Sequence, residues 1–463
     1  MPAVVSQQIA TPATPAVPRE DLLGTDARDA RRWLGLAVLA LAYSGVLAII
    51  LVIGRIPGLA PALIHDPDFA RRCLVVHVNL AVGVWFFSFV AGLVGLLPGP
   101  RPRRARIIAP SLTALGVVAC AISMWFRSAA PVLSNYVPVL HDRLFLMGLA
   151  LCALGISASF FDRRLLAVTR APSLGPIPRD AALGLRTAAC AFLIAMATIV
   201  VAYVTREPHG EVVAGYERLF WGGGHVLQIA AEMGMLAAWL ILLRHETGET
   251  VLSPWRARVV FGSMLLPAFA APWLTLDPLP NPAFTTIMEL GLAPAVVVVI
   301  WSGARSLYRR RASCHAWSPA FSGLSTSVAM TLIGFMFGAA ITANTTLTPA
   351  HYHMNIGAVT VAFMTVLLTF MSGREVPARW HRLAIWQPII YGIGQSMFAT
   401  GLGIAGFWGQ AARKIYGPEQ HGGTVVERSG LVFAGVGGLL ALVGGAMFVV
   451  LIARAWRRRR LAE

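Results

Sequence analysis

Long apolar runs recur along the chain between Trp33 and Trp456, separated by short polar segments rich in arginine and proline. An α-helix of about 20 apolar residues crosses the hydrocarbon core of a bilayer. The pattern therefore predicts an all-α, polytopic membrane protein with twelve transmembrane helices. Their expected limits are residues 33–54, 72–98, 106–127, 141–161, 181–204, 216–243, 256–276, 283–305, 321–344, 349–371, 384–408 and 430–455.

The polar ends of the chain divide it into three parts. Residues 1–32 are polar and rich in proline and alanine, which predicts a disordered N-terminal tail without a cleavable signal peptide. Residues 33–456 form the membrane domain, and residues 457–463 form a basic tail. No internal repeat or separate soluble domain is expected.

The charge of the chain fits a membrane location. Only 13% of the residues are charged, against about 25% in soluble proteins. The formal net charge of +17 comes from arginines concentrated in alternate loops and at the C-terminus, where positive charge marks the cytoplasmic side. We therefore expect the lipid bilayer as the main partner, both termini in the cytoplasm, and no nucleic-acid binding. The five cysteines form no C-x-x-C pair and are expected to be small core residues.

Four of the eleven histidines fall inside predicted spans. His77 lies on the second span, His225 on the sixth, and His351 and His353 on the tenth. The predicted topology places all four in the outer part of the bilayer. Ionisable residues inside a membrane are costly and usually functional, so a shared site is favoured over unrelated hydrogen-bonded histidines.

The two histidines of the tenth span are two residues apart. On an α-helix such side chains point about 200° apart, so one helix offers an imidazole to each of two separate partners. Imidazole is a common metal ligand and an axial ligand of haem. The alternative is a pair of polar histidines at the membrane surface.

This pattern resembles subunit I of the haem-copper oxidase superfamily, which has a bundle of twelve transmembrane helices. The segments that carry the resemblance are Val75–Asn79 around His77, Phe220–Val226 around His225, and the His351-Tyr352-His353 triplet. A further segment, Gly401 to Gly406 followed by Arg413 and Lys414, is similar to the glycine and basic-pair element after the family's eleventh span. The resemblance covers nearly all of residues 33–456.

The resemblance implies two haems, which we expect to be b-type. By analogy, His77 and His353 would hold a low-spin haem, His351 would hold a high-spin haem, and His225 would bind an active-site metal. Arg413 and Lys414 would meet the haem propionates. The implied function is electron transfer from an outer-side donor such as cytochrome c to O2, in the inner membrane of a bacterium.

The seventh span departs from the family pattern. It contains no histidine between Val259 and Trp273, so the chain cannot supply the usual three-histidine copper site. The tyrosine expected four residues after the sixth-span histidine is also missing, because Ile229 stands there. The copper site is therefore expected to be incomplete.

Two carboxylates inside spans could contribute to a site for a metal other than copper. Glu232 lies seven residues after His225 on the same helical face, and Glu289 lies near the outer start of the eighth span. Because carboxylate and imidazole suit iron, His225 with Glu289 could form a non-haem iron site like that of bacterial nitric oxide reductases, with Glu232 as a further catalytic candidate. Alternatively, both are protonated, hydrogen-bonded residues or members of a proton relay.

Four functions therefore stay open. The first is an oxidoreductase that reduces O2, and the second is a related subunit that reduces NO. The third is a haem electron-transfer or sensor subunit that has lost the copper centre. The absence of histidine from the seventh span favours this third function. The fourth is a transporter without haem, which leaves the histidine pattern unexplained.

Overall fold

The computed structural model describes residues 28–97, 104–161, 177–206, 211–277, 281–309, 317–342, 344–371, 378–409, 411–413 and 423–462. Within these ranges, twelve helical spans are long and apolar enough to cross a membrane, which confirms the predicted fold class. The helices are α1 (Arg28–Ile53), α2 (Leu59–Leu63), α3 (Pro67–Val78), η2 (Asn79–Val84), α4 (Trp85–Gly95), η3 (Arg104–Ile108), α5 (Ala109–Ser123), α6 (Arg143–Phe160), α8 (Arg179–Val204), α9 (Val212–Thr247), α10 (Pro254–Ala268), α11 (Ala271–Leu274), α12 (Ala283–Arg309), α13 (Pro319–Ala339), α14 (Leu347–Met371), α15 (Ala378–Phe407) and α16 (Val425–Ala462).

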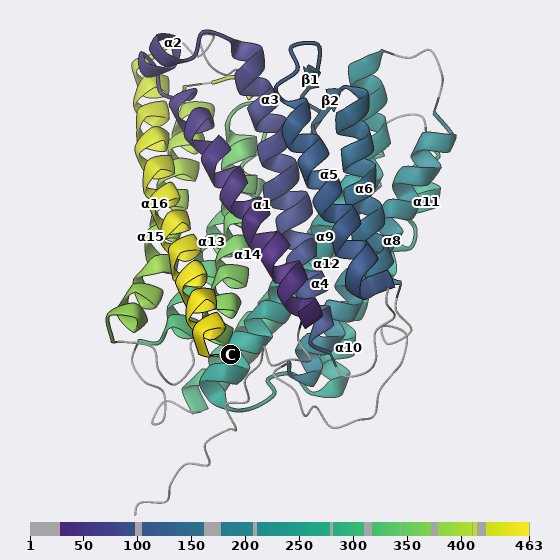
Figure 1. Cartoon of the computed structure of the whole chain (residues 1–463), viewed down its shortest axis with the longest axis vertical. Helices are drawn as coiled ribbons and strands as arrows, with labels where there is room; N and C mark the ends of the chain where they lie inside the picture. Colours follow the sequence, from purple (N-terminus) through teal and green to yellow (C-terminus); the bar gives the residue numbers. More distant parts are fainter. Residues whose placement is uncertain are drawn as a thin grey trace, which may run out of the picture.

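The helices stand side by side in one bundle (Figure 1). The start of α1 and the C-terminus lie at the same end, as an even number of spans requires. The opposite end carries α2 and a short hairpin of β1 (Ala130–Val132) and β2 (Val139–His141). The sequence pattern did not predict this hairpin.

The structure describes part of each predicted tail. Residues 28–32 were expected in the disordered tail, but they form the start of α1. Residues 1–27 lie outside the described residues. At the other end, α16 continues as a helix through the basic segment up to Ala462. Arginine is a good helix former, so the basic composition of this segment is compatible with helix.

Two spans are interrupted. The second span consists of α3, the π-helical turn η2 and α4, so its backbone changes pitch directly after His77. The seventh span breaks between α10 and α11, with Pro267 near the end of the first and Pro272 in the first turn of the second. Proline removes a backbone donor and ends or kinks a helix at such positions.

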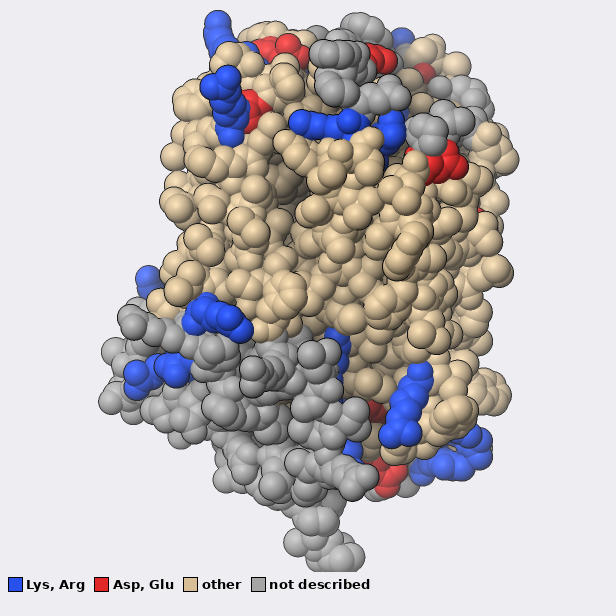
Figure 2. All heavy atoms as spheres, turned by 90° about the vertical axis from the view of Figure 1, so that its right-hand side faces the viewer, with Lys and Arg blue, Asp and Glu red and all other residues tan. Residues whose placement is uncertain are grey.

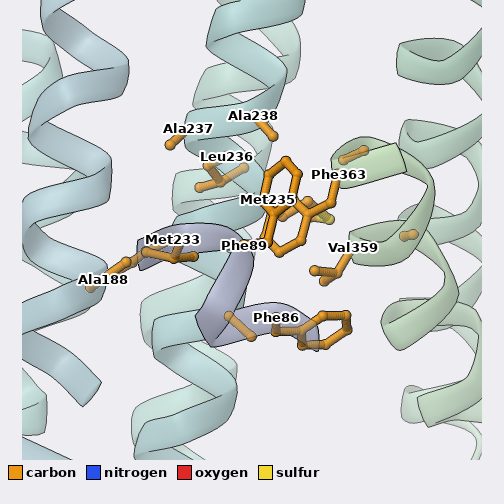
Figure 3. Packing of buried hydrophobic residues seen from close by; sticks show 14 of the residues in the cluster. Phe86, Phe89, Ala188, Met233, Met235, Leu236, Ala237, Ala238, Val359 and Phe363 are labelled. Carbon is orange, nitrogen blue, oxygen red and sulfur yellow. The ribbon is translucent and has the colours of Figure 1, made fainter. Parts of the chain in front are cut away.

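Two central helices, α9 and α14, form the middle of the bundle. Their most apolar windows are 89% and 83% buried, against 22% for α12. Aromatic rings from α4 and α14 interlock beside α9 (Figure 3): Phe89 stacks on Phe363 at 4.3 Å between ring centroids, and Phe86 meets Phe363 edge-on at 5.7 Å. Such packing holds α14 against α4.

The surface matches a membrane environment. Figure 2 shows an uncharged band between two ends that carry the arginines and acidic side chains. Large apolar side chains are exposed within the spans, including Leu39, Leu154, Val200, Leu290 and Trp301. Lipid tails can cover such side chains at no cost in free energy. Together with the twelve spans, this surface identifies a multi-pass membrane protein.

Candidate functional site

His77 is held at the end of α3 by the first span. Its Nδ1 atom lies 2.9 Å from both the carbonyl oxygen and the hydroxyl of Ser44. The Ser44 hydroxyl also donates to the carbonyl of His77 at 3.2 Å. Since the Ser44 carbonyl can only accept, Nδ1 carries the proton and Nε2 keeps its lone pair.

His351 is held in the same way by α13. Its Nδ1 atom donates to the carbonyl of Gly334 at 2.7 Å. The ring packs closely on Gly338, where an added Cβ atom would lie 2.7 Å from the imidazole. Glycine at position 338 is therefore required for the observed position of the ring, which again leaves Nε2 as the lone-pair nitrogen.

His353 turns to the other side of α14, as the helical spacing predicts. Its ring meets Phe398 of α15 edge-on at 4.7 Å. Among the described residues it has no hydrogen-bond partner, and it lies close enough to His77 and Arg55 to interact with both electrostatically. His353 and His77 therefore lie near each other, whereas His351 faces a different helix.

These three rings keep some accessible surface although helices surround them. On α14, the residues that remain partly exposed include His351, Tyr352, His353 and Ile356, whereas the helix is otherwise almost fully buried. Accessible surface on the inner part of a central helix requires neighbouring space. All three rings thus have adjoining space, and His77 and His351 also have an anchored Nδ1 atom and a free Nε2 lone pair, as metal-ligating histidines do.

His225 has a different environment. It is 2% exposed, and both of its ring nitrogens are hydrogen bonded. Nδ1 donates to the carbonyl of Trp221 at 2.7 Å, and Nε2 accepts from the hydroxyl of Tyr136 at 2.7 Å. The rings of Trp221, Tyr136 and Phe284 surround the imidazole at 4.9, 4.3 and 5.4 Å between centroids.

Tyr136 reaches His225 from the segment between β1 and β2. A Cβ atom at position 224 would lie 2.3 Å from Cβ of Tyr136, so the glycine lets the tyrosine pack directly on α9. Burial raises the pKa of Tyr136 far above its usual value, so the hydroxyl keeps its proton at neutral pH. Sequence reasoning missed this residue, and the three consecutive glycines before His225 were the one signal of a closely packed neighbour.

The two candidate carboxylates do not join His225. Glu289 lies exposed on α12, on a different face from Phe284, which stacks on the histidine. Glu232 is 7% exposed, and its Oε1 atom has no hydrogen-bond partner among the residues that the structure describes. The predicted pairing of His225 with Glu289 is therefore absent from this structure, and its described residues contain no group of three or more His, Cys, Asp and Glu side chains that could hold a metal ion.

Arg413 lies beside the start of α14. Its guanidinium carbon lies 6.0 Å from the centroid of the Tyr352 ring, and its carbonyl accepts a 3.1 Å hydrogen bond from the buried Arg55. Two guanidinium groups thus lie close to His353 and its neighbour Tyr352. Lys414, the other member of the predicted basic pair, lies outside the described residues.

The predicted glycine element positions Arg413. At position 406 an added Cβ atom would lie 2.4 Å from the backbone nitrogen of Leu347, so only glycine lets α15 approach the first turn of α14. Thr346 donates from its backbone nitrogen to Ala411 at 2.9 Å and from its hydroxyl to Leu402 at 2.8 Å. These contacts fix the chain that leads to Arg413.

Comparison with solved structures identifies the fold. The chain is similar to a haem-copper terminal oxidase, solved as a dimer by cryo-electron microscopy, with a TM-score of 0.72 and 18% sequence identity. The similarity covers 93% of this chain and 84% of the solved one. The chain has the haem-copper terminal oxidase fold. In this structure His77 lies on α3 of the second span, His225 on α9, and His351 and His353 on α14.

Sequence comparisons add two relatives. One is an uncharacterized protein of Aquifex aeolicus, 29% identical over 74% of this chain and 84% of that protein. The other is an uncharacterized protein of Rickettsia prowazekii, 22% identical over 91% of this chain and 94% of that protein. No protein-family model matches the sequence.

Proposed function

We propose that the chain is a membrane haem protein that holds two haems and passes electrons between them. His77 and His353 would hold one haem, and His351 would hold the other. The observation that carries this proposal is the anchoring of Nδ1 of His77 and His351 by backbone carbonyls, which leaves each Nε2 free to ligate iron.

Bound haems would supply one-electron redox chemistry. The chain's own residues would orient the haem ligands, exclude water and place charge near the haems. Ser44 and Gly334 fix the tautomer and direction of two imidazoles, and the apolar core around Phe363 excludes water. Arg55 beside His353 and Arg413 beside Tyr352 place positive charge where it would stabilise carboxylate groups such as haem propionates.

The direction of electron flow follows from the position of these residues. Arg55, which follows the end of α1, donates a hydrogen bond to the carbonyl of Arg413, and α1 ends beside α2 at the end of the bundle that carries the β1–β2 hairpin (Figure 1). We assign this end to the outside and both termini to the cytoplasm of a bacterial inner membrane, because arginines gather in the opposite loops. The electron donor would then be an outer-side protein such as cytochrome c.

A second candidate function is the reduction of O2 or NO at the haem on His351. Glu232 favours it, because a buried carboxyl group whose Oε1 atom lacks a partner inside a membrane domain is suited to holding a proton. The environment of His225 does not favour it, because both ring nitrogens of this histidine are already hydrogen bonded.

Absorption spectroscopy of the purified full-length protein tests the main proposal. We expect two haems per chain by pyridine haemochrome assay and a six-coordinate low-spin signal. His77→Ala should remove the low-spin signal and leave about half of the haem, because His351 is unaffected. His65→Ala, exposed at the same end of the bundle, is the matched control and should change neither quantity.

Two results would contradict the proposal. One is purified protein without haem under haem-sufficient expression. The other is a low-spin signal that persists in both His77→Ala and His353→Ala. Turnover assays with O2 and NO then separate electron transfer alone from reduction of either gas.

A further inference from the structure

His225 has no electron pair left for a metal ion. The carbonyl of Trp221 can only accept, so Nδ1 of His225 is the donor in that 2.7 Å hydrogen bond. The proton on Nδ1 leaves Nε2 as the acceptor, and the hydroxyl of Tyr136 donates to it at 2.7 Å. The imidazole is therefore neutral and fully hydrogen bonded without a metal.

The space around His225 is filled by side chains. Gly222 gives room to Phe284, whose ring atom would lie 2.7 Å from an added Cβ atom, and Gly224 gives room to Tyr136 at 2.3 Å. Phe284 stacks on the imidazole at 5.4 Å between ring centroids, and the Tyr136 ring lies tilted against it at 4.3 Å. The glycines thus let aromatic rings, rather than metal ligands, pack around the histidine.

Tyr136 is held in this position by several contacts. Asn79 of the second span donates to the carbonyl of Pro138 at 2.7 Å, and the backbone nitrogen of Asn135 donates to Glu217 of α9 at 3.2 Å. The Ser134 hydroxyl donates to the carbonyl of Val137 at 2.5 Å. The tip of the hairpin is therefore a fixed part of the bundle.

The described residues contain no group of three or more His, Cys, Asp and Glu side chains around His225 that could hold a metal ion. The helices α10 and α11, which form the seventh span, contain no histidine, cysteine or carboxylate. Glu289 lies exposed on α12. Copper sites need several soft or imidazole ligands, and iron sites need several imidazole or carboxylate ligands. One histidine that is already hydrogen bonded at both nitrogens is too little for either metal.

We infer that Tyr136 takes the place of a metal ion at His225, and that this Tyr136–His225 pair makes the chain a protein without copper or non-haem iron. The inference goes beyond haem binding and does not depend on it. In this interpretation His225 holds the hairpin in place through Tyr136, and Tyr136 prevents a metal ion from binding to His225.

Metal analysis gives the first test. Purified full-length protein is incubated with Cu²⁺ or Fe²⁺ and desalted, and total copper and iron are compared with haem iron. We expect no stoichiometric copper and no iron beyond that of the haem. A stoichiometric third metal that is lost in His225→Ala would overturn the inference, while leaving haem ligation by His77, His351 and His353 intact.

A double-mutant cycle gives the second test, with thermal unfolding as its readout. Tyr136→Phe removes the hydroxyl alone and should lower the unfolding midpoint by about 1–3 °C. In the His225→Leu background the same change should have little further effect. Tyr308→Phe, which alters a tyrosine 74% exposed on α12, is the matched control and should leave the midpoint unchanged. Equal decreases for Tyr136→Phe in both backgrounds would show that the two side chains are uncoupled and would refute the pair.

Discussion

The side-chain amide of Asn79 donates a 2.7 Å hydrogen bond to the carbonyl of Pro138. Asn79 stands two residues after His77, and Pro138 stands two residues after Tyr136. The same amide also donates to Val75 at 2.9 Å, inside the helical turn that carries His77. One buried side chain therefore joins the second span to the hairpin that packs on His225.

Replacing Asn79 should disturb both ends of this connection. Asn79→Ala removes two buried hydrogen bonds, and we expect a loss of about 1–3 kcal/mol of stability together with a weaker low-spin haem signal. Thermal unfolding and absorption spectra measure the two effects. Asn344→Ala, an exposed position, serves as the control. An unchanged unfolding midpoint in Asn79→Ala would mean that the connection contributes nothing.

Gly338 decides where the ring of His351 lies. In Gly338→Ala the new Cβ atom would lie 2.7 Å from the ring, so the imidazole must move and its hydrogen bond to Gly334 weakens. We expect about fivefold weaker binding of the haem on His351, corresponding to a hydrogen bond of about 1 kcal/mol. Haem titration with separate low-spin and high-spin signals measures this change.

The matched control for Gly338 is another helical glycine with open space around it. Gly262→Ala in α10 meets nothing within 4 Å and should leave both haem signals unchanged. If Gly338→Ala and Gly262→Ala bind haem equally well, His351 is not held as we describe.

Gly224 lets Tyr136 reach α9. Gly224→Ala would place a Cβ atom 2.3 Å from that of Tyr136, and the backbone of the hairpin has to move away. Overpacking of this kind costs about 1–3 kcal/mol, which thermal unfolding detects. Gly215→Ala lies on the same helix with nothing within 4 Å, and it should be neutral or slightly stabilising. A Gly224→Ala protein as stable as Gly215→Ala would contradict the packing of Tyr136 on α9.

Asp66 begins the helix that leads to His77. Partial burial opposes ionisation, but the backbone amides of Phe69 and Asp68 and the guanidinium of Arg72 hold the pKa of Asp66 below its usual value of 3.8. A depressed folded-state pKa stabilises the protein above the unfolded pKa, and this stabilisation is lost as the pH falls through the folded value.

The variant Asp66→Asn tests this pH dependence. It should be slightly less stable than the wild type at neutral pH, because asparagine keeps the helix cap but loses the ion pair with Arg72. The difference should shrink toward zero as the pH falls below 3.8. Chemical unfolding at a series of pH values measures it, and a difference independent of pH would exclude the ionised carboxylate as its source.

The twelve spans were predictable from the sequence alone, because the need to satisfy every backbone hydrogen bond in lipid restricts a long apolar run to a helix. The separation of His351 from His353 was also predictable, since it follows from the helical period within one segment. The role of Gly406 beside the start of α14 was suggested by the glycine element that precedes Arg413.

The partners of these residues were decided only by the tertiary structure. Ser44 and Gly334, which hold His77 and His351, lie 33 and 17 residues away along the chain, and Tyr136 lies 89 residues from His225. Hydropathy records which face of a helix is buried but carries no information on which distant side chain meets it. The exposure of Glu289 is likewise set by the rotation of α12 in the bundle, which depends on the packing of Phe284 against the rings around His225.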